Sequence, residues 1–123
     1  MSTLNVSNIT DGTTTVGTSY VVNGSAKAWV NYKGTSTNVV RDSQNISSVT
    51  DNNSGDYILN FSSNMGNANY CFDTGTDANA SNDGFNRTAS SGMTTSTLRV
   101  LHYEGENNTD TSIYTASVTG DLA

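Results

Sequence analysis

Apolar and polar residues alternate along several short segments of this chain. Ala26, Ala28, Val30 and Tyr32 fall on one face of an extended segment. The same period of two recurs at Tyr57, Leu59 and Phe61, at Ala68, Tyr70 and Phe72, and at Leu98, Val100 and His102. Because successive side chains of a strand point to opposite faces, this pattern predicts half-buried antiparallel β-strands. No run of ten residues combines a helical period with good helix formers, so no helix is predicted.

Clusters of Asn, Asp, Gly, Ser and Thr separate these segments. Residues 51–55 predict the turn of a β-hairpin between strands at 45–50 and 56–61, and a third strand at 68–73 is expected to complete a meander. Asn23-Gly24 predicts another tight turn, because both residues tolerate a positive φ. With a strand roughly every ten residues, the sequence predicts an all-β fold, either an antiparallel sandwich or a jelly-roll-like barrel.

The length of 123 residues predicts one β-domain, residues 19–123, preceded by a short N-terminal arm, residues 1–18. The arm is polar with weak strand signals, and we expect it to become ordered on a partner. Hydrophobic residues make up only 33% of the chain, which predicts a thin core that neighbouring subunits complete. Since charged residues are only 13%, the composition does not favour disorder of the main body.

Charge and composition argue against nucleic acid and membranes as partners. A net charge of −6, with five Lys and Arg residues, argues against a nucleic-acid surface. No stretch approaches the ~20 apolar residues of a membrane span, and the N-terminus lacks the pattern of a cleaved signal, so neither membrane insertion nor export is expected. Cys71, the single cysteine, permits no intrachain disulfide and fits synthesis in a reducing cytoplasm.

Candidate catalytic groups are few. A hydrolytic triad needs a base, and His102 is the only histidine. The position of His102 on an apolar strand face is more typical of a packed, hydrogen-bonded residue or of a residue at a subunit interface. Cys71 has no second cysteine to pair with and is expected to be an inert small residue and not a nucleophile. Paired carboxylates such as Glu104 and Glu106 lie in expected turns, where acidic residues are common. We therefore predict no catalytic residues, no enzymatic activity and no cofactor.

One loop gathers oxygen donors of the kind that calcium binds. Asp73, Asp77, Asn79 and Asp83 form this weak candidate. The spacing does not match an EF-hand loop, because Asn82 occupies the glycine position. No metal is therefore predicted.

Three residues are candidate binding residues. Trp29, flanked by Lys27 and Asn31, has the chemistry to stack on a sugar ring, although the residue pattern favours packing against a neighbouring subunit or sheet. Phe85 and Arg87 lie in the long polar insertion 74–92, which we expect to be an exposed contact loop distal to the arm. The alternative is that Phe85 folds inward and closes the end of the barrel.

A longer pattern joins several of these segments. It consists of residues 24–34 (GSAKAWVNYKG), 40–43 (VRDS), 45–52 (NISSVTDN), 55–61 (GDYILNF), 67–70 (NANY) and 118–123 (VTGDLA). In this order the segments resemble a virion surface module of marine, cyanophage-like tailed bacteriophages, and the resemblance covers residues 17–123. The family pattern often has a proline near residues 65–68, where this chain has Gly66. The missing proline affects the expected type of this turn and leaves the expected fold unchanged.

The resemblance implies a non-enzymatic structural protein on the outer surface of a tailed bacteriophage particle: a short fibre, a knob, or a decoration protein on capsid or tail. It would be a homotrimer, attached to another capsid or tail protein through the arm and made in the host bacterial cytoplasm. The alternative is a receptor- or glycan-binding adhesin at the tip of a tail fibre, with a host cell-surface glycan as ligand. Capsid or tail location and the symmetry of the assembly remain open at this point.

Overall fold

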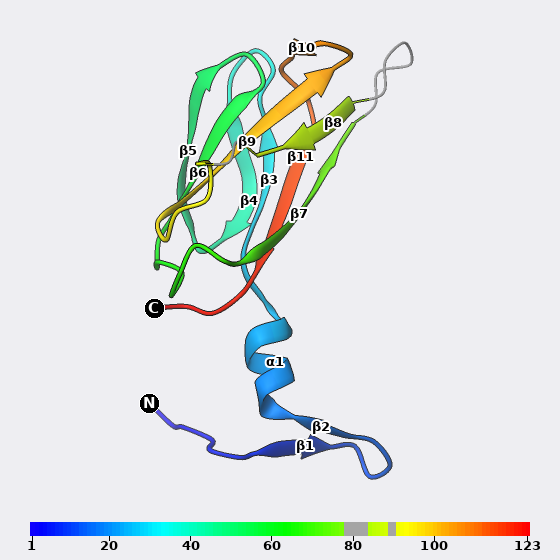
Figure 1. Ribbon diagram of the computed structural model, residues 1–123, viewed down its shortest axis with the longest axis vertical. Helices are drawn as coiled ribbons and strands as arrows, with labels where there is room; N and C mark the ends of the chain where they lie inside the picture. The colour runs from blue at the N-terminus through cyan, green and yellow to red at the C-terminus, as the bar shows by residue number, and fades with distance from the viewer. Residues whose placement is uncertain (78–83, 89–90) are drawn as a thin grey trace.

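The computed structural model describes residues 1–77, 84–88 and 91–123 (Figure 1). Eleven strands and one helix lie along this described part of the chain. Their bounds are β1 Asn8–Thr10, β2 Thr15–Gly17, α1 Thr18–Gly24, β3 Ala26–Lys33, β4 Val39–Gln44, β5 Ile46–Asn53, β6 Asp56–Phe61, β7 Cys71–Thr76, β8 Gly84–Arg87, β9 Thr97–Glu104, β10 Asn107–Asn108 and β11 Tyr114–Thr119.

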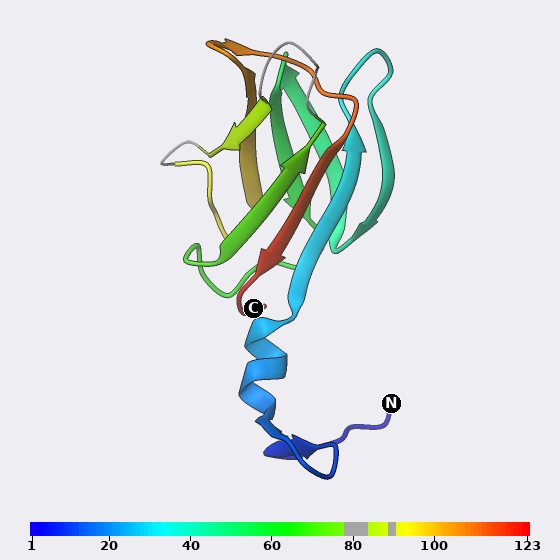
Figure 2. The same ribbon diagram turned by 90° about the vertical axis from the view of Figure 1, so that its right-hand side faces the viewer.

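Two antiparallel sheets face each other as a sandwich, which confirms the predicted all-β architecture (Figure 2). One sheet has the order β10-β9-β6-β5, with β8 also paired to β9. The other has the order β4-β3-β11-β7. The sheets do not close into a barrel. The first and last strands of the sandwich, β3 and β11, therefore lie side by side in the centre of the four-stranded sheet.

The core lies between the two sheets and consists of the inward residues of the predicted alternation. Inward side chains of four strands are almost fully buried: Ala28, Val30 and Tyr32 on β3, Tyr57, Leu59 and Phe61 on β6, Leu98, Val100 and His102 on β9, and Tyr114, Ala116 and Val118 on β11. Leu59 pairs with Leu98, and Tyr57 with Val100, so the large residues of β6 and β9 share one face. Removal of this apolar surface from water, at roughly 25 cal/mol per Å², is the main force that holds the sheets together.

A cluster of tyrosines fills the core near the ends of β3 and β6. The ring centroids of Tyr57 lie 5.1 Å from those of Tyr32 and 5.8 Å from those of Tyr114. The Tyr57 hydroxyl donates to Asp110 Oδ1 at 3.1 Å. A Cβ at Gly34 would lie 2.1 Å from that hydroxyl, so only glycine leaves room for this ring. Burial raises the pKa of Tyr32 to about 12.

The hairpin of strands 45–50 and 56–61 is confirmed as β5 and β6, but the predicted meander is wrong. β6 pairs next with β9, whereas β7 pairs with β11 in the opposite sheet. Met65 and Tyr70, both buried, lie in the connection that crosses between the sheets. The Gly66 N–H donates to the Asp121 carbonyl at 2.8 Å and fastens this crossing to the C-terminal segment. The strand after it begins at Cys71, and Ala68 is exposed.

The N-terminal segment forms a small unit of its own, the hairpin β1-β2 followed by α1. Asp11 Oδ1 accepts the Thr13 and Thr14 N–H groups at 3.0 and 2.8 Å and closes the hairpin turn. Thr18 joins helix to hairpin, because its Oγ1 donates to the Val6 carbonyl at 2.9 Å. The tight turn predicted at Asn23-Gly24 is wrong, because both residues belong to α1. The sequence boundary after Thr18 falls inside this helix, and the sandwich begins at Ala26.

The arm, predicted as residues 1–18, therefore extends to residue 25. It projects from one end of the sandwich, close to the C-terminus (Figures 1 and 2). Lys27 links the two parts: its Nζ donates to the Val22 carbonyl of α1 and, at 3.0 Å, to the Ser25 carbonyl. The opposite end of the sandwich carries the turns that follow β3, β5 and β9 (Figure 1).

Candidate functional site

The outer face of the four-stranded sheet carries one aromatic and a row of small polar residues. Trp29 on β3 pairs with Ser117 on β11, and Ser117 pairs with Asp73 on β7. In the adjacent row, Asn31 pairs with Thr115 and Thr115 with Gly75. The six residues Trp29, Asn31, Asp73, Gly75, Thr115 and Ser117 define the sheet-face groove. They come together only through strand register, since β3 and β7 are far apart in the sequence.

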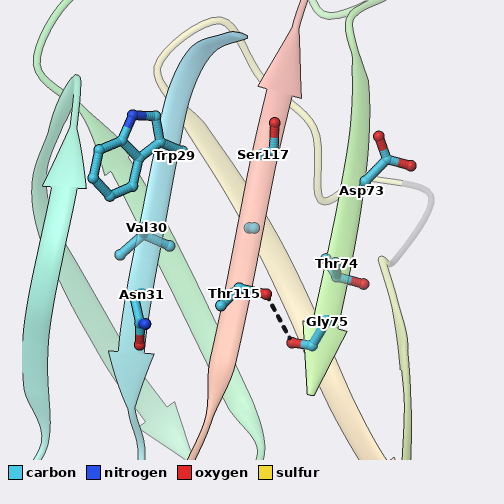
Figure 3. Close-up of a pocket in the computed structure, with 9 residues that line it drawn as sticks. Trp29, Val30, Asn31, Asp73, Thr74, Gly75, Thr115 and Ser117 are labelled. Carbon is cyan, nitrogen blue, oxygen red and sulfur yellow. Dashed lines mark hydrogen bonds between the residues drawn. The ribbon is translucent and has the colours of Figure 1, made fainter.

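The groove is a hollow of about 380 Å³, within the size range of small-ligand sites (Figure 3). Trp29 stands on one side and Asp73 on the other, with Ser117 and Thr115 between them. Gly75 keeps the floor low, because a Cβ there would lie 2.7 Å from Thr115 Oγ1. The described residues of the groove therefore combine a flat apolar wall, small hydroxyls and a carboxylate.

The indole of Trp29 is held in place. It is half-buried, and its Nε1 donates to Gln44 Oε1 on β4 at 2.9 Å. The ammonium of the neighbouring Lys27 binds the end of α1. The Trp29 ring is thus oriented before any ligand arrives.

The polar side chains of the groove differ in how many hydrogen bonds they make within the protein. Asn31 Oδ1 accepts from Arg41 Nη1 at 3.2 Å, while Arg41 Nη2 donates to the Ser112 carbonyl at 2.8 Å. Thr115 Oγ1 makes only a long contact, 3.4 Å, with the Gly75 carbonyl. Asp73 is exposed, and the ion pair found among the described residues joins Arg99 to Asp56 elsewhere. No cationic side chain lines the groove among these residues.

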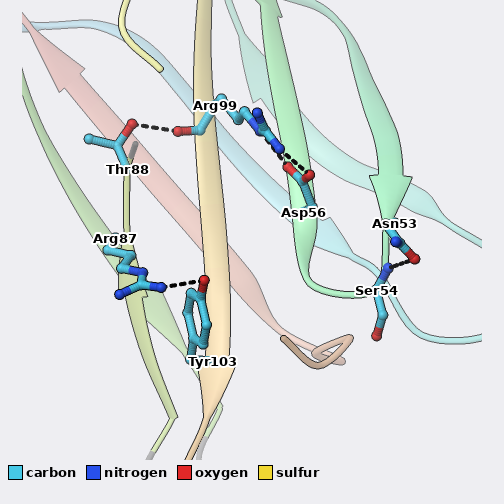
Figure 4. Close-up of polar contacts among 7 residues, drawn as sticks. All are labelled: Asn53, Ser54, Asp56, Arg87, Thr88, Arg99 and Tyr103. Atoms are coloured by element: carbon cyan, nitrogen blue, oxygen red, sulfur yellow. Dashed lines mark hydrogen bonds and ion pairs between the residues drawn. The ribbon is translucent and has the colours of Figure 1, made fainter. Parts of the chain in front are cut away.

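Phe85 and Arg87, the other predicted binding residues, lie on β8 at the edge of the opposite sheet. Phe85 stacks on Tyr103 with a centroid distance of 5.4 Å. The Arg87 guanidinium carbon lies 3.9 Å from the Tyr103 centroid, and Arg87 donates to the Tyr103 hydroxyl (Figure 4). The insertion 74–92 is therefore partly strand. Phe85 is 46% exposed, so it does not plug the sandwich.

The same sheet also carries a two-pronged ion pair. Arg99 Nε and Nη2 donate to the two Asp56 carboxylate oxygens at 2.8 and 2.6 Å (Figure 4). This hydrogen bonding lowers the pKa of Asp56. Thr88 Oγ1 donates to the Arg99 carbonyl at 2.6 Å. These contacts tie β8 and β9 to the β5-β6 turn, which is a structural role.

The weak calcium candidate is not assembled by the residues that the structure describes. Asp73 and Asp77 lie four residues apart along an extended segment, about 13 Å by strand geometry. Burial raises the pKa of Asp77, but hydrogen bonds from Ser112, Thr111 and the Ile113 N–H outweigh it and lower the pKa overall. Asn79 and Asp83 lie outside the described residues. Within residues 1–77, 84–88 and 91–123, no three His, Cys, Asp or Glu side chains group as metal ligands.

His102 is a packed, hydrogen-bonded residue, as predicted. It is fully buried, and its Nδ1 lies 2.9 Å from Asn86 Oδ1 on the neighbouring strand. Burial lowers the pKa of His102, which keeps the ring neutral. Cys71 is a free, exposed thiol at the start of β7.

The arm was predicted to be polar, but it presents a second candidate surface that is apolar. Among the described residues, eight of the thirteen exposed large hydrophobic residues belong to it: Met1, Leu4, Val6, Ile9, Val16, Tyr20, Val21 and Val22. A hollow of about 410 Å³ lies between hairpin and helix, lined by Leu4, Val6, Ile9 and Val21 among others. α1 buries none of its residues. The signal that could have revealed this surface is the spacing of Val, Ile and Leu within the Thr- and Asn-rich background.

The chain matches no family model, no curated protein and no solved structure. In the described part of the chain, no helix has the length and apolar character that a membrane crossing needs.

Proposed function

We propose that this chain is a non-enzymatic structural protein on the outer surface of a tailed bacteriophage particle, anchored by the arm and displaying the sandwich. The observation that carries the proposal is the apolar surface of the arm. Val21 and Val22 are 44% and 54% exposed on a helix that buries nothing. Contiguous exposed apolar surface marks an interaction site, and complete burial of one such side chain contributes about 1.5–3 kcal/mol.

The shape of the molecule supports this division of roles. The arm and the C-terminus lie at one end, so docking through the arm leaves the opposite end of the sandwich free (Figure 1). The arm is nearly uncharged, with Asp11 as its single ionisable side chain apart from Tyr20, which suits an apolar protein partner better than a charged one. A capsid or tail protein is the partner we propose, with the chain present as a homotrimer made in the host bacterial cytoplasm.

The test is incorporation into particles. Virions of the phage that carries this gene are purified by density gradient and examined by mass spectrometry and immunogold labelling. We expect the protein to band with the particles and the label to lie on their outside. Absence from purified virions, with the protein abundant in the lysate, would refute the proposal.

A matched pair of variants tests the anchor. Val21→Asp places a charge on the arm, whereas Val39→Asp makes the same change at an equally exposed site on β4, 43% against 44%. We expect Val21→Asp to be lost from particles and Val39→Asp to be retained. Equal incorporation of both would place the anchor elsewhere on the chain.

The alternative function, a glycan-binding adhesin, is favoured by a separate observation. The sheet-face groove places an oriented tryptophan opposite a carboxylate across small hydroxyl residues.

A further inference from the structure

We propose that the sheet-face groove is a binding site for an uncharged saccharide. This inference concerns the isolated protein and does not rest on a virion location. It combines three features of the described residues: a fixed aromatic wall, a floor of small polar groups, and the charge of the site.

The aromatic wall is Trp29. One face of a pyranose ring presents C–H groups, and such a face packs well on a flat, apolar indole. The hydrogen bond from Nε1 to Gln44 fixes the indole and leaves its ring as the contact surface. Because the ring is already ordered, little side-chain entropy is lost when a ligand stacks on it.

The floor supplies the partners that sugar hydroxyls need. Ser117 and Thr115 each carry a hydroxyl that both donates and accepts, and Asn31 carries an amide. Gly75 keeps the space above them open. Across the floor, the exposed Asp73 carboxylate is an acceptor for two neighbouring hydroxyl groups in charge-assisted bonds.

Charge selects among carbohydrates. Asp73 is the only charged side chain that lines the groove in the described chain, and the protein carries a net charge of −6. An acidic sugar would bring its carboxylate or sulfate against Asp73, while Arg41, the cation beside Asn31, is already engaged by Asn31 Oδ1 and the Ser112 carbonyl. Neutral hexoses and N-acetylhexosamines are therefore the favoured class.

Distance argues against a small cation as the ligand. An ammonium ion would gain from both the Trp29 ring and the Asp73 carboxylate. However, β3 and β7 are two interstrand spacings apart, about 9–10 Å, so one small cation does not reach both. An extended saccharide that lies across β11 contacts both sides of the groove.

The chain contains one tryptophan, so the Trp29 indole N–H is a unique NMR reporter of this site. Full-length ¹⁵N-labelled protein is titrated with glucose, galactose, N-acetylglucosamine and a neutral trisaccharide, and in parallel with glucuronic acid. We expect saturable shifts of the Trp29 indole and of the Ser117 and Thr115 amides with at least one neutral sugar, at millimolar affinity for this open site. Glucuronic acid should give none.

Three variants separate binding from folding. Trp29→Ala removes the wall, Gly75→Ser fills the floor, and Asp73→Asn replaces a charge-assisted acceptor by a neutral one. We expect loss of binding in the first two and roughly a tenfold weaker affinity in the third, with the remaining amide spectrum unchanged. Tyr103→Ala, an aromatic truncation on the opposite sheet, is the control and should bind normally.

Three results would overturn the proposal. One is the absence of saturable shifts with every neutral sugar at tens of millimolar. Another is a stronger response to glucuronic acid. The third is a Trp29 signal that changes with protein concentration alone, because a second copy of the chain would then occupy the face. None of these results bears on whether the protein is found in virions.

Discussion

The arm and the sandwich place their apolar residues in opposite ways. In the sandwich, strand alternation turns Leu59, Leu98 and Val118 inward, where each is at most 1% exposed. In the arm, Leu4 and Val22 remain 82% and 54% exposed. The sandwich therefore buries its large apolar side chains in its own core, whereas the arm leaves its apolar side chains exposed to solvent.

This contrast has an energetic consequence. A two-stranded hairpin and a seven-residue helix are each marginal in water, since neither buries enough surface to offset the ordering of its backbone. Local hydrogen bonds from Asp11 and Thr18 set the shape of the arm, but they add only about 1 kcal/mol each. The sandwich should determine the stability measured for the free protein, and the arm should gain stability when a partner covers it.

The largest effect should come from the sandwich core. Leu98→Ala leaves a cavity at a fully buried site and should lower the free energy of unfolding by about 2–5 kcal/mol. Val22→Ala, on the arm, should leave it within about 0.5 kcal/mol of the parent protein. Urea unfolding followed by circular dichroism measures both. Similar losses in the two variants would mean that the arm packs on the sandwich.

The second prediction compares two glycines. Gly34→Ala drives a methyl group into the Tyr57 hydroxyl and should destabilise the protein by about 1–3 kcal/mol. Gly24→Ala, at the end of α1, meets nothing within 4 Å and should be neutral or slightly stabilising. Thermal melts of the two proteins measure the difference. A neutral Gly34→Ala would show that the tyrosine cluster moves aside at no energetic loss.

The third prediction concerns pH. Burial lowers the pKa of His102 below the ordinary value of 6.5, against opposing effects of Glu104, Asp77 and Asp110. Below about pH 6.5 the unfolded chain therefore binds a proton that the folded protein does not, and stability falls by at most about 1.4 kcal/mol per pH unit toward the folded pKa. His102→Gln should flatten this dependence between pH 7.5 and 5.5 in urea titrations. An unchanged slope would assign it to other groups.

The smallest expected effect on folding is that of the sheet-face groove. Asp73→Asn changes an exposed residue without an ion pair among the described residues, and it should shift stability by less than about 0.5 kcal/mol. Differential scanning calorimetry checks this value. A larger loss would mean that Asp73 supports β7 itself, and the groove variants would then need to be compared at equal folded fraction.

The period of two was sufficient to predict β3, β6 and β9 and their inward residues, except that Ala26 at the start of β3 is exposed. It was not sufficient to predict their partners, because alternation defines the face of a strand and not its neighbour in the sheet. The meander failed for this reason, since β6 pairs with β9 across an interval of 35 residues between Phe61 and Thr97. α1 was missed because it is only two turns long and rich in β-branched valine.

The candidate sites could not be predicted in full either, because they also depend on which strands pair. Trp29 was selected for its ring, but Ser117 and Asp73 join it only because β11 lies between β3 and β7. Phe85 and Arg87 were identified as exposed, yet they lie on the opposite sheet and are engaged with Tyr103. A cross-strand site of this kind cannot be seen in local sequence, whereas the valines of the arm are visible there, although they follow no clear strand or helix period.

The pairing of β3 with β11 governs when the protein is able to fold. β11, the last strand of the sandwich in chain order, is the central partner of β3, the first, so the four-stranded sheet cannot form until residues up to Thr119 have been made. At typical synthesis rates this delay lasts roughly 5–20 s after β3 emerges. During that time the apolar arm has already left the ribosome and is exposed to solvent. A chain that ends before Tyr114 lacks β11, and we expect proteases to degrade it before it assembles.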